Sequence, residues 1–285
     1  MLTLSTAANK TGLILILLMS SFFAFAQSQS DKNKALEIEA DTLIGRQDYA
    51  GALKLYSAII QKSKPHTEEE YKLYYKRAVC YYGLQNFAEA LKDINIYIEK
   101  YPQEQAKLLR AYINQGLGDD EAQLADLNEL LSSNPDNPEL IQWRMSVLME
   151  SEQYAEAQKD IRRLLNYQSS PELKSYLGLA YYYQNNPDSA LTIFDEVIKE
   201  DPKFVQTYLY AASLCLDEEA YKLALNYINM GLQAEPSNMT MLFYKGIALA
   251  ESNQTEEGCR CLTKAFKGGI DEVAAYLKEY CYTVK

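Results

Sequence analysis

The sequence predicts an all-α solenoid of about seven helix-turn-helix units, wound into a right-handed superhelix and closed by a C-terminal capping helix. Three observations carry this prediction. A small residue recurs every 33 or 34 residues along most of the chain. Large apolar residues follow it at helical spacings, and a proline closes several of the units. Since a helix pair of this size cannot bury its own apolar face, neighbouring pairs must stack on one another.

The first segment of the chain has the pattern of a secretory signal. Residues 1–26 contain Lys10, an apolar run from Leu13 to Phe25, and alanines on both sides of Phe25. A charged start, a short apolar core and an A-x-A end are typical of a signal peptide, cleaved here near Ala26. An uncleaved anchor is the alternative, although the run is short for a membrane span. We therefore expect an exported protein, periplasmic or extracellular, in which a polar segment, residues 27–33, precedes the repeats.

Residues 34–267 are expected to form the repeats. The recurring residue on the second helix of each unit is small except in the third unit; the positions are Ala52, Ala90, Gln123, Ala157, Ala190, Ala224 and Gly258. The first interval is lengthened by the loop KSKPHTEEE. A second small residue, midway along several first helices, lets the two helices of a pair approach closely. These positions are Ala78, Gly178, Ala212 and Gly246.

This pattern resembles the tetratricopeptide repeat, a 34-residue helix-turn-helix unit. The fifth unit matches it most fully, at Leu177, Gly178, Tyr181, Ala190, Phe194 and Pro202. The first, third and fourth units depart from it, and the third has Asn114 and Gln123 where apolar or small residues are expected. Together with the signal peptide, the resemblance implies a secreted or periplasmic bacterial protein of this family.

The C-terminal residues 268–285 are predicted to form the capping helix after a Gly-Gly break. Its apolar side consists of Val273, Tyr276, Leu277 and Tyr280. In an oxidising compartment we expect a disulfide between Cys259, on the last repeat helix, and Cys281, on the cap. Pairing of Cys261 with Cys281, or free thiols, are the alternatives. Cys80 and Cys215 fall among core positions and are expected to be small buried hydrophobes.

Composition argues against several function classes. The formal net charge is −11 and no basic run interrupts the acidity, so nucleic acid and anionic lipid would be repelled. His66 is the single histidine, which leaves neither a catalytic triad nor a metal-ligand set. The stretch GLGDDE, at 116–121, is expected to be a turn rather than a phosphate-binding loop. We therefore expect no enzyme activity, cofactor, metal or small-molecule substrate.

The 24 tyrosines point to a protein partner. Some are expected in the core: Tyr74, Tyr81, Tyr181 and Tyr208. The resemblance implies that first helices line a concave groove, and the candidate partner-binding residues there are Tyr75, Tyr82, Tyr112, Tyr182, Tyr183 and Phe243. These positions lack the lysines, arginines and asparagines with which co-chaperone repeats hold a carboxylate, so an uncharged or basic peptide or helix is expected. The alternative is a groove filled by tight winding or by the N-terminal helix.

The favoured function is a non-enzymatic scaffold or adaptor that binds a protein or peptide in the periplasm or cell envelope, with peripheral association with an envelope complex. The alternative is a structural subunit of a secretion or outer-membrane assembly complex, in which the array is permanently covered. The two differ in whether the purified mature protein is a stable monomer with an open groove.

Overall fold

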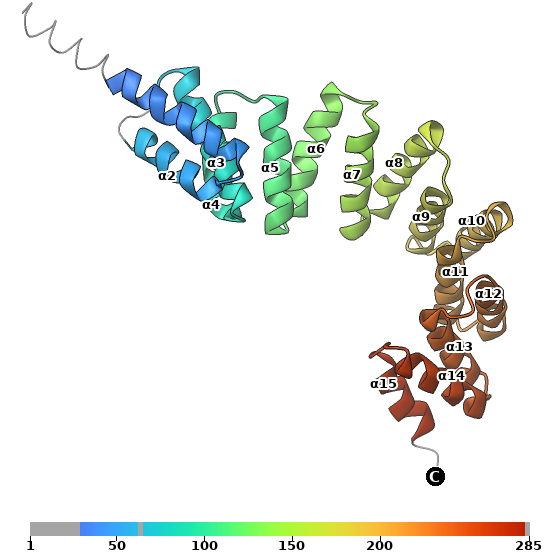
Figure 1. The fold of residues 1–285 in the computed structure, drawn as a ribbon. Helices are drawn as coiled ribbons and strands as arrows, with labels where there is room; N and C mark the ends of the chain where they lie inside the picture. Colours follow the sequence, from blue (N-terminus) through green and yellow to red (C-terminus); the bar gives the residue numbers. More distant parts are fainter. Residues whose placement is uncertain (1–28, 62–64, 283–285) are drawn as a thin grey trace, which may run out of the picture. The chain divides into compact units, whose positions relative to one another are not determined.

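The computed structural model describes residues 29–61 and 65–282, and the expected signal peptide lies outside this range. The described chain consists of helices joined by short turns (Figure 1). After a helical segment at 29–45 follow α2 (Tyr49–Ile60), α3 (Glu68–Gly83), α4 (Phe87–Ile98), α5 (Glu104–Leu117), α6 (Asp120–Ser133), α7 (Pro138–Glu150), α8 (Tyr154–Tyr167), α9 (Pro171–Tyr182), α10 (Pro187–Glu200), α11 (Val205–Asp217), α12 (Tyr221–Ala234), α13 (Met239–Glu251), α14 (Thr255–Lys267), α15 (Val273–Tyr276) and the π-helical turn η1 (Leu277–Cys281).

These helices pack in consecutive pairs, which confirms the predicted solenoid. Pairs such as α3 with α4 and α13 with α14 make the most extensive contacts, and each pair packs on the next within its unit. The chain divides into two compact units, Met1–Ser133 and Asn134–Lys285. Each has its own apolar core.

The N-terminal boundary differs from the expected one. Residues 29–33 were expected to be a polar segment, but they form the first turn of the helical segment 29–45. Leu36, Ala40 and Leu43 recur at helical spacing on this segment and pack with α2 residues such as Tyr56. Burial of that face extends the helix beyond the repeat motif.

Each pair turns in the same way. A residue with a positive φ lies one to three places after the end of each first helix, and the next amide bonds back to a carbonyl five residues earlier, as Asn86 N does to Tyr81 O (2.8 Å). This is the Schellman arrangement, which favours glycine. The chain uses glycine only once at these positions, at Gly118 within GLGDDE, which is the expected turn. The others are Gln47, Gln85, Glu152, Asn185, Glu219 and Asn253.

Small residues permit the close packing inside each pair. In the seventh pair, Gly246 and Gly258 meet backbone to backbone, since a Cβ on Gly258 would lie 2.8 Å from the Gly246 carbonyl oxygen. In the fifth pair, the nearest neighbour of Gly178 is the Phe194 ring: a Cβ would lie 2.4 Å from it. Phe194 itself is fully buried.

Three pairs contain a buried ion pair that the sequence analysis missed. Arg77 binds Asp93, Arg110 binds Asp126, and Arg144 binds Asp160, each through a guanidinium–carboxylate contact of 2.6 Å. The three aspartates are almost completely buried. A sequence pattern could have predicted these ion pairs. In three units an arginine directly precedes the first-helix position that is small in most units, and an aspartate follows sixteen residues after the arginine. The fifth pair has Leu177 and Ile193 at these positions.

The C-terminal helix covers the last repeat as expected. Val273 and Leu277 are buried against Leu262 and Ala265 of α14. Cys259 and Cys281 are joined in a disulfide that closes a separation of 22 residues, while Cys80 and Cys215 are free and buried. Cys261 is a free thiol of intermediate exposure.

Candidate protein-binding site

In unit 1 the predicted binding tyrosines pack largely against other rings. On α3, Tyr75 lies 5.5 Å from Tyr97 between ring centroids, and burial raises its pKa. Tyr82 lies between Phe87 (5.8 Å) and Tyr112 of α5 (6.3 Å). Tyr112 is 42% exposed, so it is the most accessible of the three predicted residues. Tyr75 and Tyr82 therefore contribute to the core as well as to the surface.

In unit 2 the rings of two successive pairs are joined. Tyr183, at the end of α9, is 50% exposed and stacks on Tyr154 at the start of α8, with centroids 4.7 Å apart and planes 19° apart. Tyr182 lies 5.2 Å from Tyr183. Its hydroxyl donates to Asp217 at the end of α11 (2.6 Å), and burial together with this hydrogen bond raises its pKa. Tyr154 was not among the predicted residues.

These contacts lie at the edge of unit 2 where the first helix of each pair ends and the second begins. Similar contacts occur along this edge toward the C-terminus. Tyr280 of the cap donates a hydrogen bond to Glu251 at the end of α13. Burial raises the pKa of Tyr221, at the start of α12, and the negative charge of Glu251 raises it further. The helix ends and turns of this edge are rich in acids: Glu150, Glu152, Asp188, Asp217, Glu218, Glu219 and Glu251. We call the rings Tyr154, Tyr182 and Tyr183, together with Asp217, the tyrosine strip.

Phe243 does not belong to an open surface, so that expectation was wrong. It is 6% exposed and packs 5.0 Å from Tyr276 of the cap and 5.7 Å from Tyr244. The capping segment packs over the first half of α13, and the Phe243 ring is buried in the apolar cluster that this segment forms with α13 and α14. The sequence placed Phe243 on the correct helix but could not show how far the cap covers it.

The expected core tyrosines have mixed environments. Tyr208 is buried, and its hydroxyl donates to the Pro202 carbonyl (3.2 Å). Tyr81 and Tyr181 are half-buried and pack against the core, and Arg162 donates to the Tyr181 hydroxyl (2.5 Å). Tyr74 is half-buried, with the Arg77 guanidinium 5.5 Å from its ring centre.

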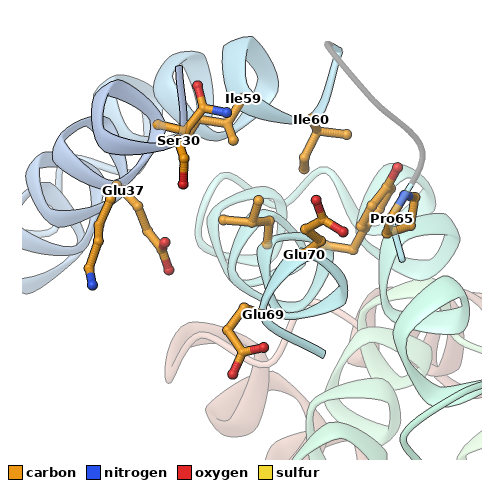
Figure 2. Close-up of a pocket in the computed structure, with 11 residues that line it drawn as sticks. Ser30, Glu37, Ile59, Ile60, Pro65, Glu69 and Glu70 are labelled. Carbon is orange, nitrogen blue, oxygen red and sulfur yellow. The ribbon is translucent and has the colours of Figure 1, made fainter. Parts of the chain in front are cut away.

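A separate cavity of about 470 Å³ lies in unit 1 between the N-terminal helix, the end of α2 and the start of α3. Figure 2 shows Ser30 and Glu37 on one side, Ile59 and Ile60 above, and Pro65, Glu69 and Glu70 on the α3 side. This cavity was not predicted from the sequence. Its only signal was the lengthened loop before α3.

Two features are absent from the residues that the structure describes. No cluster of three or more potential metal ligands occurs among them, and none of their helices is both long and apolar enough to cross a bilayer. His66 is exposed, and its backbone amide donates to the Glu70 carboxylate (2.7 Å), so it belongs to the start of α3.

Comparison with known proteins identifies the repeat. The sequence profile of the tetratricopeptide repeat matches residues 39–105, 146–203 and 176–238, more than half of the 285-residue chain. A tetratricopeptide repeat protein from Parabacteroides merdae ATCC 43184 is 20% identical, with a TM-score of 0.55 over 86% of this chain and 97% of that one. The C-terminal part of a TPR repeat-containing protein from Cytophaga hutchinsonii is 18% identical, with a TM-score of 0.60 over 84% and 98%.

A curated relative is the intraflagellar transport protein 56 homolog of Caenorhabditis elegans. It is 26% identical over 203 residues, which are 67% of this chain and 33% of that protein. The chain thus spans about a third of the length of this relative.

Proposed function

The chain belongs to the tetratricopeptide repeat family, and we propose that it is a non-enzymatic scaffold that binds a partner protein through the tyrosine strip of unit 2. Proteins of this family are generally interaction scaffolds rather than enzymes. The observation that carries the proposal is the exposed Tyr183 ring, which stacks on Tyr154. Tyr182 lies beside it and is oriented by a hydrogen bond to Asp217. Rings that are held in place lose little conformational entropy when a partner packs against them.

We further propose that the protein acts outside the cytoplasm, in the periplasm or envelope or beyond it. The signal pattern of residues 1–26 supports this, and a disulfide at the cap suits an oxidising compartment. Cell fractionation and the intact mass of the purified protein test it. Cleavage after Ala26 and recovery from the exported fraction are expected, and an intact protein in the cytoplasm would contradict export.

In-cell photocrosslinking tests the binding surface. A benzoylphenylalanine in place of Tyr183 should give a defined adduct that is lost when Tyr154→Ala is added. Tyr167 provides the matched control, because it is equally exposed (51%) but lies at the opposite end of α8. Equal adducts from both positions would refute a role for the strip.

The oligomeric state separates the scaffold from a permanently covered subunit of an assembly complex. The scaffold is expected to be a stable monomer by light scattering once the signal peptide has been removed. Aggregation that only a co-expressed partner prevents would favour the structural subunit.

A further inference from the structure

In unit 1, an aromatic ring at the start of a second helix packs against a glycine at the end of the next first helix. Tyr49 of α2 lies against Gly83 of α3 in this way. Phe87 of α4 lies against Gly116 of α5. A Cβ on either glycine would come within 2.6 Å of the ring, so the ring occupies the space of the missing side chain.

In unit 2 the same register brings two rings together. Tyr154 and Tyr183 lie 67 residues after Phe87 and Gly116, respectively. Tyr154 therefore stacks on the Tyr183 ring, with centroids 4.7 Å apart, and Tyr183 remains 50% exposed. Since glycine takes this position in unit 1, the packing of consecutive repeats does not require the Tyr183 ring.

Unit 1 also shows how this fold holds an arginine. The Arg77 guanidinium carbon lies 5.5 Å from the centre of the Tyr74 ring and 5.8 Å from that of Tyr81. The same guanidinium donates to both carboxylate oxygens of Asp93 (2.6 and 2.8 Å). Two tyrosine rings and an aspartate thus surround one arginine, which combines cation–π contact with a bidentate ion pair.

The tyrosine strip has the same groups without the arginine. The Tyr182 and Tyr183 rings lie 5.2 Å apart, and the Tyr182 hydroxyl donates to Oδ2 of Asp217 (2.6 Å). A carboxylate has acceptor sites on both oxygens, so Asp217 can also accept from a guanidinium. Among the residues that the structure describes, no lysine or arginine forms an ion pair with Asp217.

The turns around the tyrosine strip are negatively charged. Burial raises the pKa of Tyr154, and the charge of the nearby Glu152 raises it further. Exposed acids elsewhere in unit 2 are paired, as Glu156 is with Lys159 (2.6 Å). Residues 150–154, 182–188 and 217–222 contain one basic residue, Lys222, and six exposed acids that form no ion pair within the described part of the chain: Glu150, Glu152, Asp188, Asp217, Glu218 and Glu219. A cation from a partner would be attracted to this edge.

We propose that the tyrosine strip receives an arginine side chain from a basic segment of the partner protein. The guanidinium packs on the open face of Tyr183 and donates to Asp217, as Arg77 does with its own rings and aspartate. The inference rests on the proposed function, because it names the partner chemistry that the same site recognises.

Three blocked peptides test the guanidinium by NMR titration of the labelled mature protein. They have the form acetyl-GGXGG-amide, in which X is arginine, lysine or the neutral arginine analogue citrulline. The arginine peptide should shift the amides around Tyr183 and bind several-fold more tightly than the other two. Its advantage over citrulline should shrink in about 0.5 M salt, because the charges are screened. An arginine peptide that binds no better than the lysine or the citrulline peptide would overturn the proposal.

Variants connect the peptide to the tyrosine strip. Tyr183→Gly copies Gly116, so it should keep its helicity by circular dichroism but lose the preference for arginine over lysine. Asp217→Asn should weaken binding of the arginine peptide several-fold. Glu139→Gln is the matched control, because it removes one charge at the start of α7, and it should bind as the wild type does. Equal effects of Asp217→Asn and Glu139→Gln, or an unchanged preference in Tyr183→Gly, would overturn the proposal.

The photocrosslink from Tyr183 separates this inference from the proposed function. Sequencing of the trapped partner peptide should show an arginine within a few residues of the attachment point. An adduct to a segment without arginine would overturn the inference and leave the binding role of the strip intact. If Tyr183 gives no adduct above the Tyr167 control, the proposed function fails and the inference fails with it.

Discussion

Three consecutive tyrosines at the C-terminal end of α9 have three different environments. Successive helical side chains point about 100° apart, so Tyr181, Tyr182 and Tyr183 cannot share one core. Tyr181 packs inward beside Arg162, Tyr182 is half-buried against Asp217, and Tyr183 remains open on Tyr154. The helical period predicts which residue leaves the core. It does not predict that the next repeat supplies a carboxylate to the second ring.

Addition of one methyl group at Gly178 should lower the free energy of unfolding. The Gly178→Ala variant places a Cβ within 2.4 Å of the buried Phe194 ring, and overpacking of this kind costs about 1–3 kcal/mol. Gly45→Ala is the control, because Gly45 is helical and a Cβ there meets nothing within 4 Å. Urea unfolding should show a loss for the first and a gain of up to about 1 kcal/mol for the second. A Gly178→Ala protein as stable as the wild type would contradict the packing.

The three free thiols should differ in reactivity. Burial raises the pKa of Cys80 and of Cys215 to about 12, so almost no thiolate forms at neutral pH. Cys261 is more accessible, although burial raises its pKa too. Maleimide treatment of the native protein should label Cys261 first, as peptide mass spectrometry can show, and reach the other two only in denaturant. Early labelling of Cys80 would contradict the structure.

At the scale of a helix pair, removing one partner of a buried Arg–Asp contact should lower the free energy of unfolding. Replacing both partners with apolar residues should change it little. In the third pair, Asp126→Ala leaves the Arg110 guanidinium without its carboxylate, and loss of one partner of a buried pair costs about 3–5 kcal/mol. The double variant Arg110→Leu/Asp126→Ile copies the fifth pair, which has Leu177 and Ile193 there. It is expected to be close to wild type in urea unfolding. A double variant as unstable as Asp126→Ala would show that the ion pair is itself required.

The start of α3 should respond to acid. The Thr67 side chain and Glu70 form a capping box, and the hydrogen bond from the His66 amide, followed by the Thr67 bonds, lowers the pKa of Glu70. A carboxyl with a lowered folded-state pKa stabilises the fold above its unfolded pKa of about 4.3, and this is lost as pH falls through the folded value. Amide exchange at Thr67 should therefore accelerate below about pH 4.

Two variants make that measurement specific. Glu70→Gln should remove most of the acid dependence at Thr67, because the side chain no longer titrates. Glu69→Gln, one residue away and without the capping contacts, should retain it. If both variants behave alike, the capping box is not the cause.

The helices themselves were largely predictable, because the same spacing of small and apolar residues recurs in each repeat. The small residues, the closing prolines and the apolar side of the cap placed every helix pair. Contacts between repeats were less predictable. The Tyr154–Tyr183 stack, the burial of Phe243 and the cavity beside α3 depend on how neighbouring pairs pack, and a period within one repeat contains no such information. Asn114 and Gln123 were recognised as departures, and both are buried.

At the scale of the molecule, the two ends of the described chain differ. The C-terminal end is covered by α15 and η1 and locked by Cys259–Cys281. At the other end, Ile38 on the N-terminal helix is 60% exposed. In a solenoid each repeat is stabilised by its neighbours, so a change at one end should fade with distance along the array.

Reduction of the disulfide tests this directly. Closing a loop of 22 residues is worth about 3 kcal/mol by the chain-entropy estimate, so reduction should loosen the cap by a similar amount. Hydrogen exchange with mass spectrometry should show lost protection over 255–282 and, since Phe243 loses its cover, in α13. Helices α2–α6 should keep their protection, and Cys261→Ser should leave the effect unchanged. Uniform loss across both units would mean that the chain unfolds as one cooperative body rather than from its end.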